Sequence, residues 1–173
     1  VVVRDYVSGA MENTSATIHG EFVQKNFREL AEKPNDDIIA HELFHQWFGD
    51  LVTCTSWSHL VLNEGFAVFG EQLWHEYKYG RDAGLWKQYN SMQSYLRYAE
   101  NNVDEPIIQF NYADKEDMFN AITYQKGARV LQLLRMEIGD DAFFKSLRNY
   151  LQQYSFSNAD IDDFRKECEK VCG

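Results

Sequence analysis

Two histidines four residues apart constrain this chain more than any other feature of its sequence. His41, Glu42 and His45 form the pattern His-Glu-x-x-His. Residues four apart on an α-helix differ by about 40° around its axis, so both imidazoles leave the same face of the helix. Two neutral ring nitrogens on one face are suited to hold a metal ion. The pattern therefore predicts a helix that carries part of a metal site.

A glutamate further along the chain can complete this site. Glu64 lies in the segment Leu-Asn-Glu-Gly-Phe-Ala, and a carboxylate from a second helix can serve as a third ligand. Two histidines and one glutamate leave the fourth position of a tetrahedral zinc open for water, which is typical of a catalytic zinc. Glu42 lies about 60° from His45 around the helix, beside the metal, where a general base is needed. We therefore expect His41, His45 and Glu64 to bind zinc and Glu42 to act as the base.

The main alternative for the histidines is a surface helix that happens to carry two polar residues. Apolar neighbours argue against it, because they surround most of the helix and predict that the helix is buried. Buried imidazoles beside a buried carboxylate need partners, and a zinc ion supplies one. Glu64 alone could instead be a carboxylate favoured by the dipole at a helix N-terminus. The apolar neighbours are Ile38, Ile39, Leu43, Phe44, Trp47 and Phe48.

Composition excludes several classes of protein. The chain has 173 residues, 45% hydrophobic and 15% aromatic, which is enough for one sizeable core and excludes disorder. It has no run of 18 apolar residues, so no membrane span is expected, and Val1–Val3 is too short for a signal peptide. A net charge of −10 argues against nucleic-acid binding, which needs a basic patch. The same charge can attract a cationic substrate, although ordinary solubility also accounts for it. Three cysteines form no disulfide framework and give no indication of compartment.

The chain changes character once along its length. Residues 1–20 are rich in β-branched types and predict two strands that flank a loop at Ser8–Asn13. Residues 21–173 are mostly helical in pattern, without a linker or a repeat. We therefore expect one domain, 1–173, with an α+β fold that is mainly helical. The predicted helices run from a cap at Asn35, Asp36 or Asp37 to Gly49, from Glu64 to about Tyr77, from a cap at Asp82, from about Thr123 to Ile138, from Asp140, and from Asn158 or Asp160, with Asn101–Lys115 irregular.

Four motifs occur in a fixed order along the chain. They are Gly-Ala-Met-Glu-Asn at Gly9–Asn13, then His41–Gly49, Leu62–Ala67 and Ile122–Ala128. Eighteen residues, 46–63, separate the second histidine from the glutamate. In this order and spacing the chain resembles the catalytic segment of the gluzincin aminopeptidases, the family that contains aminopeptidase N and leukotriene hydrolase. The resemblance spans nearly the whole chain, and the one departure is Val61, where the family commonly has tryptophan.

The resemblance implies a thermolysin-like (zincin) catalytic domain that is truncated, because family members are several times longer, and it implies one zinc ion. In the family, the glutamate that matches Glu12 binds the free α-amino group of the substrate. The residues that match Gly9, Ala10 and Met11 bring the backbone close to the peptide. The tyrosine that matches Tyr124 donates a hydrogen bond to the tetrahedral oxyanion. From the residues alone, Glu12 could be an ordinary loop glutamate and Tyr124 could belong to a helix core.

The implied function is the removal of amino-terminal residues from peptides by a zinc-activated water. The expected partners are peptides with a free amino terminus and the remaining domains of a longer parent protein. Alternatives stay open. An epoxide hydrolase of the leukotriene type shares the same constellation, and an endopeptidase shares the histidine motif. A truncated zinc-binding core with little activity of its own, or a helical interaction module that binds no metal, also remains.

Overall fold

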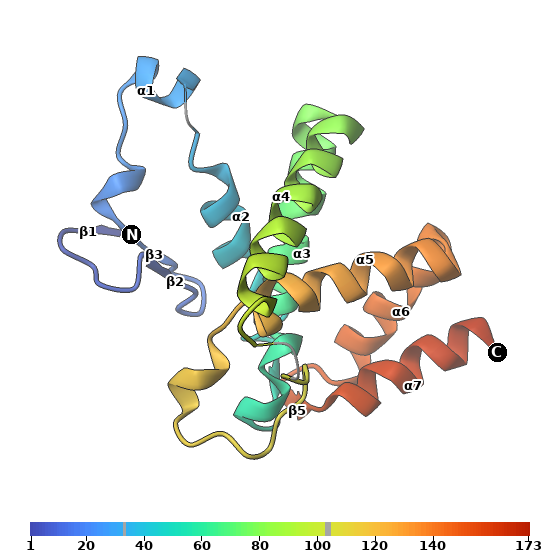
Figure 1. Cartoon of the computed structure of the whole chain (residues 1–173). Helices are drawn as coiled ribbons and strands as arrows, with labels where there is room; N and C mark the ends of the chain where they lie inside the picture. The colour runs from blue at the N-terminus through green and yellow to red at the C-terminus, as the bar shows by residue number, and fades with distance from the viewer. Residues whose placement is uncertain (33, 103–104) are drawn as a thin grey trace.

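Short strands occupy the amino end of the chain, and helices occupy most of the rest. The computed structural model describes residues 1–32, 34–102 and 105–173. The α-helices are α1 (Phe27–Glu32), α2 (Asp36–Phe44), α3 (Glu64–Tyr79), α4 (Arg81–Ala99), α5 (Gly127–Ile138), α6 (Asp140–Gln153) and α7 (Ile161–Cys172). The strands are β1 (Val2–Val3), β2 (Ala10–Met11), β3 (Ile18–Gly20), β4 (Val52–Cys54) and β5 (Ser157–Ala159). Short segments of 3₁₀-helix are η1 (Glu21–Val23), η2 (Trp57–Leu62) and η3 (Lys115–Met118), and a short π-helical segment is η4 (Ile122–Lys126). Figure 1 shows β1–β3 and α1 on one side, α5–α7 on the other, and α2–α4 between them. The predicted α+β fold, mainly helical, is confirmed.

The amino-terminal sheet differs from the two strands that we expected. β3 lies in the middle, with β1 parallel on one side and β2 antiparallel on the other. The expectation of one continuous loop at Ser8–Asn13 is wrong, because Ala10 pairs with His19 and Met11 with Ile18 inside it. Gly9, just before β2, has a φ of +82°, a conformation that glycine adopts without strain. Two of the five residues of the Gly-Ala-Met-Glu-Asn motif, Ala10 and Met11, are therefore fixed by sheet pairing.

The sequence did not predict the second sheet. β4 and β5 pair in parallel, with Val52 opposite Ser157 and Cys54 opposite Ala159. Each strand has three residues, which is too short to show an alternating pattern in the sequence. This pairing joins the segment that follows α2 to the connection between α6 and α7.

After residue 63, the observed helix boundaries lie close to those predicted from the sequence. α3 ends at Tyr79 before Gly80, and the Asp160 side chain caps α7 by accepting a hydrogen bond from the Asp163 amide at 3.0 Å. The prediction that Asp82 caps α4 is wrong by two residues, because Gly80 occupies the cap position. Asn101–Lys115 is irregular until η3 begins at its last residue, although 103 and 104 lie outside the described residues. Among the described residues, none of the helices combines the length and hydropathy needed to span a bilayer.

The helix that carries the histidines is shorter than we expected. α2 ends at Phe44 rather than at Gly49, because the backbone then tightens: the Gln46 amide bonds to the Leu43 carbonyl at 3.2 Å. At its other end, Asn35 holds the cap position but makes no side-chain cap hydrogen bond. The histidine motif therefore spans the end of a helix and the turn that follows it.

α2 is also less buried than its apolar composition predicted. Ile39, Leu43 and Trp47 remain 48%, 54% and 45% exposed, so the expectation of a helix buried all round is wrong. The reason is that α2 packs mainly against α3 on one side and touches β2 on another, which leaves this stripe uncovered by any described element. Glu42 is the residue of α2 that is fully buried.

Glycines let α3 approach its neighbours closely. A Cβ placed on Gly70 would lie 2.4 Å from the ring of Phe44 on α2. A Cβ on Gly65 or on Gly127 would lie 2.8 Å or 2.5 Å from Cγ2 of Val61. Distances this short do not occur between real side chains, so these positions require glycine. Val61 fills the narrow space beside Gly65 and Gly127, which leaves no room there for a tryptophan.

The hydrophobic core lies where α3 meets the carboxy-terminal helices. The rings of Phe48 and Phe66 stack with centroids 4.4 Å apart, and Phe164 of α7 meets Phe66 edge-on at 5.1 Å. Tyr150 of α6 joins the same cluster and is 1% exposed. Because Phe66 lies in the first turn of α3, this packing fixes the end of the helix that begins with Glu64.

One acidic side chain at the start of α2 anchors that helix to α3. Asp36 accepts hydrogen bonds from the Tyr79 hydroxyl at 2.7 Å and from the Trp74 indole at 3.3 Å, and it forms an ion pair with Lys78. Burial disfavours the charged carboxylate, but these partners outweigh it and lower the pKa of Asp36 below 3.8. The stabilisation is therefore present above about pH 4 and is lost as the pH falls through the lowered folded-state value.

We expect Asp36→Asn to lower the thermal midpoint at neutral pH and to have less effect in strong acid. The loss should be about 1 kcal/mol or less, because the Lys78 side chain is 40% exposed and solvent screens the pair. Thermal melts of both proteins between about pH 2 and pH 7 measure this. Asp162→Asn, in an exposed pair on α7, is the matched control. A difference that stays constant across this range would contradict the assignment.

Candidate active site

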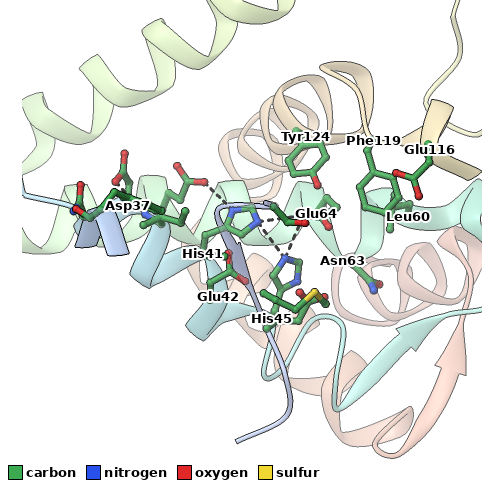
Figure 2. Close-up of a pocket in the computed structure, with 18 of the residues that line it drawn as sticks. Asp37, His41, Glu42, His45, Leu60, Asn63, Glu64, Glu116, Phe119 and Tyr124 are labelled. Atoms are coloured by element: carbon green, nitrogen blue, oxygen red, sulfur yellow. Dashed lines mark hydrogen bonds and ion pairs between the residues drawn. The ribbon is translucent and has the colours of Figure 1, made fainter. Parts of the chain in front are cut away.

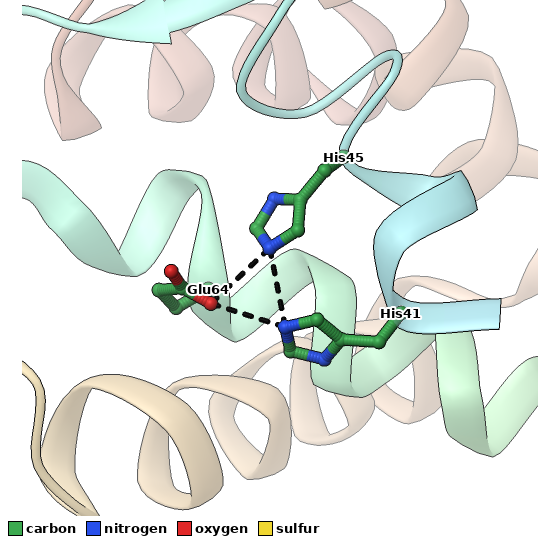
Figure 3. A group of neighbouring side chains, drawn as sticks. All are labelled: His41, His45 and Glu64. Atoms are coloured by element: carbon green, nitrogen blue, oxygen red, sulfur yellow. Dashed lines mark hydrogen bonds and ion pairs between the residues drawn. The ribbon is translucent and has the colours of Figure 1, made fainter. Parts of the chain in front are cut away.

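Three side chains converge on one point: His41 of α2, His45, which directly follows α2, and Glu64 of α3. His41 Nε2 lies 3.1 Å from His45 Nε2 and 3.1 Å from Glu64 Oε2, and the latter two atoms are 3.2 Å apart. Figure 3 shows the two rings and the carboxylate directed toward one another. Ligands of a tetrahedral zinc with bonds of about 2.1 Å lie roughly 3.4 Å from each other. The triangle has nearly that size, so the three residues that the sequence predicted as ligands fit a zinc ion.

The outer nitrogen of each imidazole has its own partner. His45 Nδ1 lies 3.0 Å from the carbonyl oxygen of Phe48, and His41 Nδ1 lies 2.8 Å from Glu71 Oε1. A carbonyl or a carboxylate oxygen accepts hydrogen bonds, so in the neutral rings Nδ1 donates and Nε2 keeps its lone pair. Both lone pairs are thus turned toward the same point, as metal binding requires.

Glu71 is a site residue that sequence reasoning missed. It lies seven residues after Glu64, about two helical turns along the same face of α3, and this spacing was the signal that could have found it. Its other oxygen pairs with Lys87 of α4 at 2.7 Å, and Lys87 also reaches Asp37 of α2 at 3.1 Å. These contacts tie α2, α3 and α4 together behind His41.

The three converging side chains shift one another's pKa values. Burial disfavours charge on each, but their mutual hydrogen bonds outweigh it. Together with Glu71 they raise the pKa of His41 to about 10, and the two histidines lower the pKa of Glu64 to about 2. At neutral pH these shifts keep Glu64 ionised and His41 protonated, so a metal ion that binds here must displace the His41 proton.

Glu42 lies beside this triangle and outside it. It is 5% exposed, and Figure 2 shows it near the histidines. Ligand-type atoms of Glu12, Glu42 and His45 lie within 4.8 Å of one another. Burial raises the pKa of Glu42 to about 7, an effect that the histidines oppose and the negative charge of Glu12 strengthens. A carboxyl group that titrates near neutral pH can both accept and return a proton.

A cavity of about 940 Å³ opens over these groups. Its lining includes Ala10, Met11 and Glu12 from the amino-terminal sheet and the turn after it, together with Trp57 and Phe119. Figure 2 shows that Tyr124, Glu64 and the histidines face the same space. Gly9 contributes through its positive φ, which turns the chain into β2. Of the four residues that the sequence predicted to contact substrate, Ala10, Met11 and Glu12 therefore line the cavity that holds the candidate metal ligands, whereas Gly9 is not part of its lining.

Tyr124 lies against the triangle from the side of α5. Its ring is stacked with that of His41, with centroids 6.1 Å apart and planes 9° apart, and its hydroxyl is hydrogen-bonded to Glu64. Burial first, and Glu64 next, raise its pKa, so the hydroxyl keeps its proton and remains a donor. The ring also packs on the core, so the packing role and the site role coincide. Close contact between Gly65 and Gly127 brings η4 this near.

The remaining histidines take no part in these groups. Among the described residues, ligand-type side chains gather in two overlapping sets, one with His41, His45 and Glu64, the other with Glu12, Glu42 and His45. His19, His59 and His75 belong to neither.

Comparisons with known proteins agree with the sequence motifs. The sequence profile of the Peptidase family M1 domain matches residues 1–173. Aminopeptidase M1-C from Oryza sativa subsp. japonica is 37% identical over 100% of this chain and 20% of its own length. Endoplasmic reticulum aminopeptidase 1 from Mus musculus is 34% identical over 98% of this chain and 19% of its own length. The chain thus spans about a fifth of the curated relatives that it matches.

A solved structure supports the same relationship. The crystal structure of an M1 zinc metallopeptidase from Deinococcus radiodurans superposes with a TM-score of 0.75 at 26% identity, covering 99% of this chain and 35% of that one. This similarity confirms the thermolysin-like fold class that the motifs implied, and the profile confirms the resemblance to gluzincin aminopeptidases. The chain belongs to peptidase family M1.

Proposed function

We propose that this chain is the catalytic core of a zinc-dependent aminopeptidase, which removes single residues from the amino terminus of peptides. The observation that carries the proposal is the placement of Glu12 and Glu42 beside the triangle of His41, His45 and Glu64 in one cavity. His41, His45 and Glu64 would hold one zinc ion. When bound, the zinc polarises the scissile carbonyl and activates a water molecule. Relatives named as aminopeptidases support the same conclusion.

The other side chains divide the remaining work. Glu12 binds the ammonium group of the substrate through a charge-assisted hydrogen bond. Glu42 takes a proton from the attacking water and delivers it to the nitrogen of the leaving peptide. Tyr124 donates its hydroxyl hydrogen to the oxyanion that develops on the scissile carbonyl. Because Glu12 and Glu42 are close together, only the first peptide bond of a chain anchored by its amine reaches the base.

The first prediction concerns exopeptidase character. Glu12→Ala should raise KM for substrates with a free amine far more than for acetylated ones, because only the former lose a charge-assisted contact. Kinetics with paired aminoacyl anilides measure this, in the longest natural protein that carries these residues. Glu116→Ala is a matched control, since Glu116 lines the same cavity. Equal effects on both substrates would favour an endopeptidase, and turnover of a lipid epoxide in place of the anilide would favour the epoxide hydrolase.

The second prediction separates the base from the ligands. Glu42→Gln keeps the size of the side chain and lies off the metal, so the variant should retain about one zinc per chain. Turnover should fall by roughly 10²–10⁴-fold, the usual contribution of a general base. Metal analysis and kcat measured on the same preparation decide the matter. Loss of zinc together with activity would make Glu42 a ligand instead.

The third prediction concerns the hydroxyl of Tyr124. Tyr124→Phe keeps the ring stacked on His41, so zinc content and the thermal midpoint should hardly change. Removing one donor to a developing oxyanion costs on the order of 10²–10³ in kcat, with little change in KM, because the bond strengthens only in the transition state. Tyr154→Phe, at the end of α6 and outside the cavity lining, is the matched control. A kcat close to that of the unmodified protein would leave Tyr124 with its packing role alone.

A further inference from the structure

The carboxylate of Glu12 occupies a position that electrostatics disfavours. It lies within 4.8 Å of ligand-type atoms of Glu42 and His45, and two carboxylates at this separation repel each other in a partly buried site. Glu12 also lies on a turn between two strands of two and three residues, which by themselves hold it weakly. Another contact must therefore hold this turn against α2.

One amide side chain supplies two hydrogen bonds to this turn. Gln46 Nε2 donates a hydrogen bond to the backbone oxygen of Glu12 at 2.8 Å, and Gln46 Oε1 accepts one from the Ser15 amide at 2.7 Å. The carboxyl group of Asp50 interacts with the side chains of both Gln46 and Thr14. The amide nitrogen and the amide oxygen of Gln46 therefore bond to Glu12 and Ser15, at two points of the same turn.

The position of Gln46 in the chain links the turn that carries Glu12 to the candidate metal ligands. It follows His45 directly, at the point where α2 tightens and the Gln46 amide turns back to the Leu43 carbonyl. The turn that directs His45 toward Glu64 thus also directs Gln46 toward the Glu12 backbone. A neutral amide adds no charge that would compete for an ammonium group, and bonding to the backbone leaves the Glu12 carboxylate free for a substrate.

We propose that Gln46 is a positioning residue, which fixes the Glu12 carboxylate relative to the metal ligands and so makes the site select substrates by their free amine. The proposal rests on the aminopeptidase function proposed above. Gln46 touches no reacting atom and acts through the backbone of Glu12. Its loss therefore affects recognition of the amine and leaves the hydrolytic step and the metal in place.

The test uses Gln46→Met, which keeps the length of the side chain and deletes both hydrogen bonds. KM for free-amine anilides should rise on the order of tenfold, the scale expected for two lost hydrogen bonds, with kcat within about twofold. KM for the acetylated anilides, zinc content and the thermal midpoint should stay near the values of the unmodified protein. In the Glu42→Gln background, where turnover is suppressed, calorimetry should show the same loss of affinity for a dipeptide amide and no loss for its acetylated form.

Two further measurements separate positioning from simple folding. Hydrogen exchange of the Ser15 amide should accelerate in Gln46→Met, because its acceptor is gone. Gln152→Met, at an exposed position on α6, should change neither exchange nor kinetics. Faster exchange with an unchanged preference for free amines, or equal losses on free and acetylated substrates, would overturn the role of Gln46 alone. An unmodified protein that binds no zinc and cleaves no free-amine substrate would overturn the proposed function, and this role with it.

Discussion

The close approach of α2 to α3 is the contact on which the site depends. Gly70 allows the ring of Phe44 to rest directly on the backbone of α3. His41 and His45 stand on one of these helices and Glu64 on the other, and their ligand atoms are separated by only 3.1–3.2 Å. A side chain at Gly70 would force Phe44 to shift, and a metal site on the same two helices tolerates only small movements because zinc–ligand distances vary by about 0.2 Å. The packing of two helices is therefore also the geometry of the candidate metal centre.

The sequence predicted the ligands because their geometry is local. The spacing of His41 and His45 is set by helical periodicity, whatever the rest of the chain does. Glu64 was found because it opens a helix and lies in a recognisable motif. The end of α3 at Gly80 and the start of α7 after Asp160 were predicted for the same reason: a glycine or a capping carboxylate acts on its own neighbours.

Features that depend on distant partners were not predicted. Glu71 and Gln46 looked like ordinary polar residues, since the contacts that give them roles lie 30 or 34 positions away in the chain. The exposed stripe on α2 was mistaken for a buried face because composition shows apolarity without showing what covers it. β4 and β5 were missed because three residues carry no pattern of their own, and each becomes a strand only beside the other.

The pairing of β4 with β5 bears on the order in which parts of the chain can fold. Its two strands are separated by the whole of α3 to α6, and closing so long a loop costs entropy that the intervening helices must first offset by packing. β4 runs directly into η2, which leads to Glu64. A growing chain therefore carries both histidines and the glutamate long before it can lock the third of them in place. Residues outside the candidate metal site thus take part in fixing the segment that leads to Glu64.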